Sequence, residues 1–447
     1  MKYFGTDGIR QEADHFTQDF ITQIIAGLAD YATDLIPDRP AKVLIGGDTR
    51  ESSEWILQDL AIALETFGFE YSSVGILPTP AINYCFYHMG FDFAIDVTAS
   101  HNPFTDNGIK IFERGEHSGV KLSEKGCNFI ENSLQNSETF PLASPTDREN
   151  LHTEALALYA EHLRDYLGSA NFSSLKIGLD CANGAMSILG GNIFEALGAT
   201  TEVINCTPTY NRIINENCGS THLSALKSLV TENSLDFGIA YDGDGDRCLL
   251  IDHTGNTITG DDIIAIIANF LNLDQIAITV MSNQGLLNWA KQHHIHAEIT
   301  SVGDSNVAAA MKAHNIKLGG EESGHIILPG EPTGDGMLTS LMMTNIIATS
   351  NTSLHDLASI LQKLPQISTT IPATNEQKNA VHQNPAITSI ISHFEEKVKT
   401  SSGRLLVRPS GTEPKIRITI WGDNESDIAA LSDELKNALT SALAKIN

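Results

Sequence analysis

Short apolar runs alternate with amphipathic segments along most of this 447-residue chain. The apolar runs that predict buried strands are 41–46, 93–97, 175–180, 237–241 and 276–280. The segments between them that predict helices are 55–67, 151–167, 185–197, 263–271 and 285–293. Strands that alternate with helices in this way form α/β units around a parallel or mixed sheet. The chain is therefore expected to be an α/β protein.

The alternation restarts along the chain, and the restarts predict the domains. New series open near residue 175 and again between residues 261 and 276. The last part differs, because the predicted strands 405–407 and 416–421 precede a single amphipathic helix, 425–446. The polar stretch 365–385 before them predicts a linker or exposed strands. We expect three similar α/β domains with mixed sheets, at 1–150, 151–254 and 255–366, and a smaller α+β domain at 367–447.

The composition argues against two classes of partner. The chain carries 28 Lys and Arg against 55 Asp and Glu, a net charge of −27, so nucleic acid and anionic membranes would repel it. No apolar run approaches the roughly 18 residues of a membrane span, and the N-terminus lacks the apolar core of a signal peptide. The six cysteines are scattered without a C-x-x-C motif, which is typical of free thiols in a reducing compartment. We expect a cytoplasmic protein.

The most informative segment is residues 241–247 (YDGDGDR), directly after a predicted strand. The carboxylates of Asp242, Asp244 and Asp246 alternate with glycines, so all three can converge on one hard divalent cation. Without a cation, three crowded carboxylates would repel one another, which disfavours an ordinary acidic turn. An EF-hand would need a glutamate at position 12, where His253 stands, and an entering helix rather than a strand.

A second polar loop, residues 98–103 (TASHNP), follows the strand 93–97. A serine at such a corner, here Ser100, can be a nucleophile or a phosphate carrier. The loop is not the G-x-S-x-G elbow of hydrolases. His101 is a poor base for Ser100, since successive side chains diverge. An ordinary turn with a capping serine remains an equal alternative on these residues alone.

Two further loops carry groups that suit phosphate and sugar. Residues 408–417 (RPSGTEPKIR) combine hydroxyls, a glycine N–H and two arginines, as an anion cradle does, although a surface turn is the alternative. Residues 319–325 (GGEESGH) place Glu321 two positions from Ser323, which suits adjacent sugar hydroxyls. Taken alone, this segment would be an exposed acidic loop.

Basic residues lie in three other polar segments. Arg10 ends the opening segment 4–10 (FGTDGIR), and Arg50 ends the segment 46–50 (GGDTR). Arginines on such glycine-rich loops offer fixed positive charge. Lys110 adds an amine close in sequence to the Ser100 loop.

Taken in order, these segments resemble the α-D-phosphohexomutase superfamily over nearly the whole chain. The resemblance identifies 98–103 as a phosphoserine loop, 241–247 as a magnesium loop, 319–325 as a sugar-recognition loop and 408–417 as a phosphate-binding loop. The segments 4–10, 217–222 (NCGSTH) and 333–336 (TGDG) are most similar to the bacterial branch that acts on glucosamine phosphate. Ser305 and Asn306 depart from the family pattern, which has arginine and tyrosine there, so either substrate contacts or the positioning of the third domain are expected to differ.

The resemblance implies four domains around a central cleft and the interconversion of glucosamine 6-phosphate and glucosamine 1-phosphate. Ser100 would carry a phosphoryl group, and glucosamine 1,6-bisphosphate would be the intermediate and activator. One Mg²⁺ per site would be held by Asp242, Asp244, Asp246 and the phosphorylated Ser100. The product would feed UDP-N-acetylglucosamine and cell-envelope synthesis. A homodimer is implied, and either a kinase or the sugar bisphosphate would phosphorylate the serine.

The resemblance also assigns roles to the remaining loops. Glu321 and Ser323 would hold sugar hydroxyls. The idle phosphate would be bound by Arg408, Ser410, Gly411, Thr412 and Arg417. Arg10, Arg247 and Lys110 would stabilise charge, and either Lys110 or His101 would shuttle the proton.

Three other functions remain as alternatives. A phosphoglucomutase or phosphomannomutase of the same superfamily would differ in how it reads the sugar 2-position. A metal-dependent sugar phosphatase would use the same aspartates and metal, but it has no need for a separate phosphate cradle. A non-catalytic sugar-phosphate sensor would not need an intact serine and metal loop.

Overall fold

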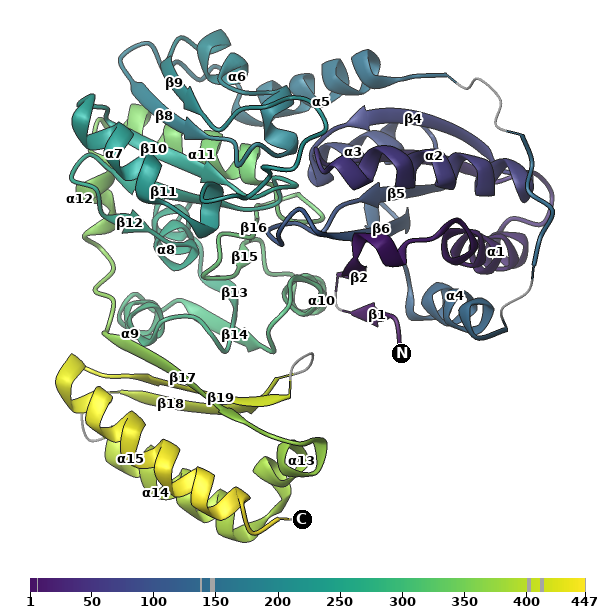
Figure 1. Ribbon diagram of the computed structural model, residues 1–447. Coiled ribbons are helices and arrows are strands. Elements are labelled where there is room, and N and C mark those ends of the chain that lie inside the picture. Colours follow the sequence, from purple (N-terminus) through teal and green to yellow (C-terminus); the bar gives the residue numbers. More distant parts are fainter. Residues whose placement is uncertain (6, 137–138, 145–148, 400–402, 411–413, 447) are drawn as a thin grey trace. The chain divides into compact units, whose positions relative to one another are not determined.

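The computed structural model describes the whole chain except residues 6, 137–138, 145–148, 400–402, 411–413 and 447 (Figure 1). The described chain divides into two compact units. The first contains residues 1–279 and 298–358, and the second contains residues 280–297 and 359–447.

The first sheet of the larger unit is mixed and has the order β1-β2-β6-β5-β3-β4, with β7 paired to β6. Its strands are β1 (Phe4–Gly5), β2 (Gly8–Glu12), β3 (Lys42–Gly47), β4 (Glu70–Ile76), β5 (Phe93–Val97), β6 (Asp106–Arg114) and β7 (Gly119–Lys121). Strands β4, β3 and β5 are parallel, whereas β6 runs antiparallel to β5 and to β2. Strand β5, which the polar loop 98–103 follows, therefore lies between the parallel strand β3 and the antiparallel strand β6.

Helices cover both faces of this sheet. Apolar side chains of α1 (Gln18–Leu35), α2 (Glu51–Thr66) and α4 (Glu124–Asn136) join those of the strands, such as Val43 and Ile45, in one buried cluster. Helix α3 (Thr79–His88) lies on the other face, where a side chain at Gly46 would meet Ile82. The alternation of inward positions along β3 explains this division, because successive residues of a strand point to opposite faces.

The second sheet has the order β12-β11-β10-β8-β9. Its strands are β8 (Lys176–Asp180), β9 (Thr200–Ile204), β10 (Phe237–Tyr241), β11 (Cys248–Asp252) and β12 (Thr257–Ile258), and helices α6 (Asn192–Ala196) and α7 (Ser224–Glu232) pack on it. Helix α5 (His152–Leu167) contacts α3 and β4 of the first sheet. The continuous helix expected over 185–197 is wrong. A short 3₁₀ turn, Ala185–Ile188, precedes α6, and Gly190 between them adopts a left-handed φ of 49° that a helix cannot contain.

The third sheet has the order β14-β13-β15-β16 and is again mixed. Its strands are β13 (Gln275–Thr279), β14 (His296–Thr300), β15 (Gly319–Gly320) and β16 (Ile326–Ile327). The nearby helices are α8 (Gly260–Phe270), α10 (Asp304–His314), α11 (Gly336–Ser350) and α12 (Leu354–Ala358). Helix α8 begins with a capping box between Thr259 and Asp262, and Asp335 caps α11 by accepting from the Leu338 N–H.

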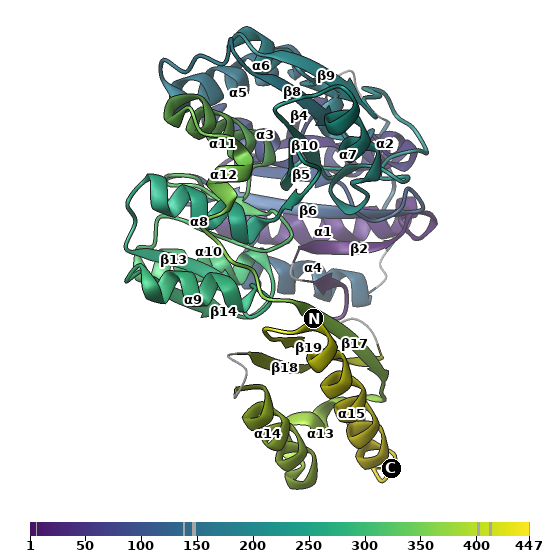
Figure 2. The ribbon, with the colours of Figure 1, turned by 90° about the vertical axis from the view of Figure 1, so that its left-hand side faces the viewer.

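The second unit contains α9 (Gln284–Gln292) and an antiparallel sheet of order β17-β19-β18. Its strands are β17 (Gln366–Pro372), β18 (Arg404–Pro409) and β19 (Lys415–Trp421), and its further helices are α13 (Asn375–Gln383), α14 (Pro385–Lys399) and α15 (Glu425–Leu443). Helices α14 and α15 lie on the same face of this sheet (Figure 2). Of the two alternatives expected for 365–385, a linker or exposed strands, the structure has a strand, because β17 pairs with β19 along its whole length and only Ile371 of it is buried.

The expected fold class is confirmed: three mixed sheets with helices and a smaller α+β part. Among the described residues, no helix combines the length and the apolar character that crossing a bilayer would require.

Candidate active site

Ser100 is buried in the loop after β5 and has a left-handed backbone φ of 54°. Such a conformation costs a non-glycine residue about 1–3 kcal/mol, so the surrounding structure must hold it. The Ser100 N–H donates to Thr98 Oγ at 2.9 Å, and the Thr98 hydroxyl donates to Asp48 Oδ2 at 2.7 Å. The loop is thus fixed from within its own domain.

Arg50 also fixes the Ser100 loop. Its side chain is fully buried, and its Nε–H donates to Asp48 at 2.9 Å. Its terminal N–H groups donate to the carbonyls of Ser100 and Asn102, both at 2.8 Å, and to those of Pro103 and Asp106. The positive charge of Arg50 is therefore fixed, as expected, but all its N–H donors are used inside the protein.

The three aspartates expected to bind metal come together at the end of β10. All three are buried, and their ligand oxygens lie within 4.8 Å of one another. The Ser100 hydroxyl donates to Asp242 Oδ2 at 2.7 Å, so the serine loop and the aspartate loop meet at this point.

The donor set fits a hard divalent cation. Asp244 Oδ2 accepts from Lys110 Nζ and from the Thr79 hydroxyl, whereas Oδ1 of Asp244 and Oδ1 of Asp246 have no hydrogen-bond partner among the described residues. Burial and the charges of the two neighbouring aspartates raise the pKa of Asp242 well above its usual range. Buried carboxylate oxygens without donors are what Mg²⁺ would satisfy.

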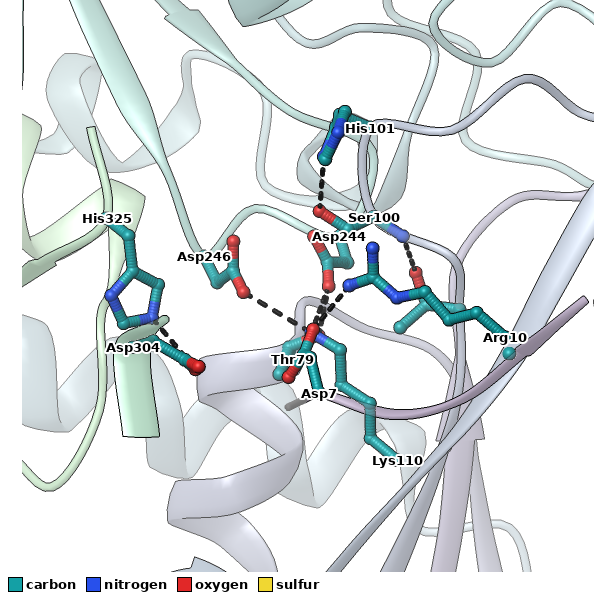
Figure 3. Close-up of polar contacts among 12 residues, drawn as sticks. Asp7, Arg10, Thr79, Ser100, His101, Lys110, Asp244, Asp246, Asp304 and His325 are labelled. Carbon is teal, nitrogen blue, oxygen red and sulfur yellow. Dashed lines mark hydrogen bonds and ion pairs between the residues drawn. The ribbon is translucent and has the colours of Figure 1, made fainter. Parts of the chain in front are cut away.

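Lys110 lies beside these carboxylates (Figure 3). Its Nζ is 2.7 Å from Asp244, 3.3 Å from Asp246 and 3.1 Å from Asp7. Burial lowers the pKa of Lys110, but the three carboxylates outweigh it and raise that pKa well above its usual value. Lys110 is therefore a fixed ammonium in this arrangement.

The two predicted arginines also reach the site. Arg247 Nε lies 3.6 Å from Asp246 and 3.9 Å from Asp242, and Arg10 forms an ion pair with Asp7. Each of these cations faces at least one carboxylate. The positive charge near Ser100 is therefore paired locally, within a chain whose net charge is −27.

His101 points toward Ser100, contrary to expectation. Its Nδ1 is 3.4 Å from Ser100 Oγ and 3.2 Å from an Arg247 nitrogen. The left-handed turn at Ser100 brings the two successive side chains to the same side, which sequence spacing alone does not anticipate. Burial, followed by the charges of Arg247 and Arg10, lowers the pKa of His101 to about 4.

The loop that contains Glu321 and Ser323 is the turn of the β15–β16 hairpin. The Gly324 carbonyl accepts from Cys248 N–H at 3.1 Å, just after the aspartate loop. Gly324 has a φ of +94°, and a Cβ there would lie 2.2 Å from the Cys248 carbonyl, so only glycine permits this approach. Glu321 Oε1 accepts from Gly303 N–H at 3.1 Å, and Ser323 is exposed.

A cavity of about 180 Å³ lies between β7 and the start of α10. Lys121, Asp304, Ser305 and His325 line it together with apolar side chains such as Phe112. Lys121 Nζ is 2.5 Å from both Asp304 and Asp7, which links the cavity wall to the Lys110 cluster. Both ring nitrogens of the buried His325 have no hydrogen-bond partner among the described residues.

The predicted phosphate cradle lies in the second unit. Arg408 and Arg417 are directly opposite each other on β18 and β19. Burial and the neighbouring Arg417 charge lower the pKa of Arg408. Ser410 is buried and donates its N–H to the Lys415 carbonyl at 2.9 Å. Gly411 and Thr412 lie outside the described residues.

Several site residues escaped the sequence analysis. Asp7 and His325 fall within segments that it singled out, 4–10 and 319–325, but only Arg10, Glu321 and Ser323 were chosen there. Asp304 precedes the unusual Ser305. Lys121 ends the three-residue strand β7, and no motif marks it.

Family models match nearly the whole chain. The phosphoglucomutase/phosphomannomutase α/β/α domains I, II and III match residues 1–140, 157–255 and 259–364, and the C-terminal domain of the same family matches 370–438. The chain belongs to the phosphoglucomutase/phosphomannomutase family. It is therefore an enzyme of the phosphohexomutase class, as the four loops indicated.

Curated relatives extend over the same length. The phosphoglucosamine mutase of Caldicellulosiruptor saccharolyticus is 39% identical over 459 residues, with 99% of this chain and 100% of the relative covered. That of Staphylococcus aureus strain Newman is 37% identical over 453 residues, with 98% of each covered.

Solved structures share the fold. A phosphoglucomutase/phosphomannomutase family protein from Burkholderia thailandensis superposes with a TM-score of 0.77 at 20% identity, covering 99% of this chain and 98% of that one. The Aspergillus fumigatus N-acetylphosphoglucosamine mutase, solved with GlcNAc-6P and magnesium, gives 0.69 at 16% identity, covering 98% and 96%.

Proposed function

We propose that the chain interconverts glucosamine 6-phosphate and glucosamine 1-phosphate through a phosphorylated Ser100. The observation that carries this proposal is the buried Ser100 hydroxyl, 2.7 Å from Asp242 within a triad of aspartates. Curated relatives at 36–39% identity that are named phosphoglucosamine mutase support the choice of substrate.

The aspartates would hold Mg²⁺ together with the phosphorylated serine. When bound, the cation neutralises negative charge on the transferring phosphoryl group. The proposed cycle transfers the phosphoryl group from Ser100 to the free sugar hydroxyl, which gives glucosamine 1,6-bisphosphate. The intermediate then turns over, and its other phosphate returns to Ser100.

The cations of the chain would stabilise the same charge from fixed positions. Lys110 is held by Asp244, Asp246 and Asp7, so these carboxylates orient its ammonium toward the site of phosphoryl transfer. Arg247 and Arg10 would act beside it. Because the contacts of Lys110 hold its ammonium in place, we assign the proton shuttle to His101, whose Nδ1 lies 3.4 Å from Ser100 Oγ.

Recognition of the sugar must work in both orientations of the intermediate. Glu321 and Ser323 would hold two adjacent hydroxyls. Arg408 and Arg417, paired across β18 and β19, would bind the phosphate that is not reacting, together with Ser410, Gly411 and Thr412. Under this proposal the protein is a cytoplasmic homodimer that supplies UDP-N-acetylglucosamine synthesis.

The phosphoserine can be tested by mass spectrometry. Incubation of the protein with glucosamine 1,6-bisphosphate and Mg²⁺ should add one phosphoryl group, located on Ser100 by fragmentation. Ser100→Ala should gain none, whereas Ser301→Ala, at an exposed loop serine, should gain one like wild type. Phosphorylation of both variants, or of neither variant nor wild type, would contradict the proposed carrier.

A further inference from the structure

Two cysteine thiols lie side by side at the ends of neighbouring strands. Strands β8 and β9 are parallel, and their last paired residues are Asp180 and Ile204. Beyond them, Cys181 N–H donates to the Ile204 carbonyl at 3.3 Å, and Asn183 N–H donates to the Asn205 carbonyl at 2.6 Å. The two segments that follow β8 and β9 therefore stay adjacent through Cys181 and Cys206.

The thiols themselves are in contact. The Cys181 S–H donates a hydrogen bond to Cys206 Sγ. A disulfide holds its two sulfurs about 2.05 Å apart, closer than two hydrogen-bonded thiols lie. Formation of the bond therefore draws the segments that carry Cys181 and Cys206 toward each other.

The two thiols differ in access and acidity. Cys206 is exposed, and Cys181 is fully buried. The hydrogen bond from Cys181 lowers the pKa of Cys206 to about 7, despite the opposing effect of burial. The same hydrogen bond, followed by burial, raises the pKa of Cys181 well above its usual value. An exposed, low-pKa thiol with a second thiol in contact is the arrangement of a reactive and a resolving cysteine.

We propose that Cys181 and Cys206 form a redox-active pair that a peroxide converts into an intramolecular disulfide. The Cys206 thiolate attacks the O–O bond of hydrogen peroxide, an S–O bond forms, and hydroxide leaves and takes up a proton as water. The Cys181 sulfur then attacks Cys206, the S–S bond forms and the S–O bond breaks. The Cys181 proton joins the second hydroxide as water. Two thiols are oxidised and one peroxide is reduced to two waters.

The position of Cys181 connects this oxidation to the active site. Residues 182 and 183 have left-handed φ values of 54° and 49°, and the segment continues to Gly184 and Ala185. Ala185 N–H donates to the Gly243 carbonyl at 2.8 Å, between the first two metal-loop aspartates. A Cβ at Gly184 would lie 2.3 Å from that carbonyl, so the two segments have no room to shift independently.

The same segment also supports the serine loop. The Ala182 carbonyl accepts from Asn215 N–H at 2.9 Å, and the Asn215 side chain donates to the Ser100 carbonyl at 2.8 Å. A disulfide at Cys181 would therefore pull on supports of both the aspartate loop and Ser100. Displacements of about 1 Å in such a site cost up to about a hundredfold in rate, so oxidation should lower mutase activity at least tenfold.

Peptide mapping tests the disulfide without reference to the substrate. Both cysteines fall in one tryptic peptide, 177–212, and cleavage after Glu195 separates them. The full chain is treated with hydrogen peroxide, blocked with N-ethylmaleimide and digested without reduction. The two fragments should remain joined, with two hydrogens lost and no maleimide on either cysteine. Separate fragments, a disulfide to another cysteine, or a sulfinic acid on Cys206 as the product would overturn the proposal.

Activity assays test the consequence, which rests on the proposed mutase function. Wild type should lose at least tenfold in activity with peroxide and regain it with dithiothreitol. Cys206→Ser and Cys206→Ala, at an exposed position outside the site, should start with wild-type activity and resist peroxide. A disulfide that forms without loss of activity would overturn the link to the active site. Reduced wild type that is inactive on glucosamine phosphates would contradict the proposed function and leave the disulfide measurement unaffected.

Discussion

Replacement of Arg50 by lysine tests how the serine loop is held. The fully buried guanidinium of Arg50 donates one hydrogen bond from Nε, two from one terminal nitrogen and two from the other. Four of these reach backbone carbonyls between Ser100 and Asp106, and the fifth reaches the buried Asp48. Lysine keeps the positive charge, so the variant changes the geometry of the donors rather than the charge.

The magnitude follows from the number of donors. An ammonium has three N–H groups, so at least two of the five hydrogen bonds must be lost. Each hydrogen bond to a charged group contributes about 1.5–3 kcal/mol, which predicts a loss of roughly 3–6 kcal/mol in the free energy of unfolding. This is a large share of the roughly 5–15 kcal/mol that stabilises a typical domain. Ser100 should also lose its fixed position, and kcat should fall at least tenfold.

Arg39→Lys provides the matched control. Arg39 forms a two-pronged ion pair with Asp92, both contacts being 2.6 Å, but its side chain is 47% exposed. Exposed ion pairs contribute at most about 1 kcal/mol, so this variant should resemble wild type. Urea unfolding would compare the stabilities, and hydrogen exchange of the amides of residues 100–106 would report the loop directly. If Arg50→Lys matched Arg39→Lys in stability, exchange and activity, the clamp would be refuted.

Three further perturbations have defined outcomes. Burial raises the pKa of Asp335 to about 6, from a usual 3.8. The folded protein therefore binds the Asp335 proton more tightly than the unfolded chain does. The free energy of unfolding gained from this proton is complete below about pH 4 and is lost as the pH rises through 6, a change of about 3 kcal/mol. Asp335→Asn, which keeps an N-cap for α11, should therefore gain about 1–2 kcal/mol on wild type between pH 5 and 7.5 in chemical denaturation, and parallel profiles would contradict this. Gly243→Ala places a Cβ 2.5 Å from the Ser100 carbonyl and 2.8 Å from Asn215 Nδ2, so kcat should fall at least tenfold, and wild-type kcat would show that the loops can separate freely. Chelation of divalent cations should abolish turnover, and added Mg²⁺ should restore wild type but not Asp244→Asn; equal recovery of both would exclude Asp244 as a ligand.

The elements that follow from local pattern were predicted well. The strand 93–97 and the strand 237–241 appear with the predicted bounds, because continuous apolar runs of this length suit a buried strand. The polar loop after each of them was also predicted from the local pattern, whereas the meeting of Ser100 with the aspartate triad was expected only from the family resemblance. These residues carry their signal in adjacent positions, where the type of side chain and its spacing restrict the chemistry.

What the sequence did not predict depends on three-dimensional context. The sequence predicted only a fixed positive charge at Arg50, and the fold alone determines that its donors bind the Ser100 loop. The approach of His101 to Ser100 depends on one left-handed φ. Lys121 reaches Asp7 and Asp304 across 114 and 183 positions of sequence, a separation that no local pattern encodes.

The central claim is tested most directly by ³¹P NMR of glucosamine 6-phosphate with the phosphorylated enzyme and Mg²⁺, beside glucose 6-phosphate and mannose 6-phosphate. The account predicts a new 1-phosphate resonance that grows fastest with glucosamine and is absent with Ser100→Ala. Faster conversion of glucose or mannose phosphate would move the enzyme to the neighbouring branch of the family and implicate Ser305 and Asn306. Free inorganic phosphate without any isomer would contradict the mutase account and indicate a phosphatase on the same fold.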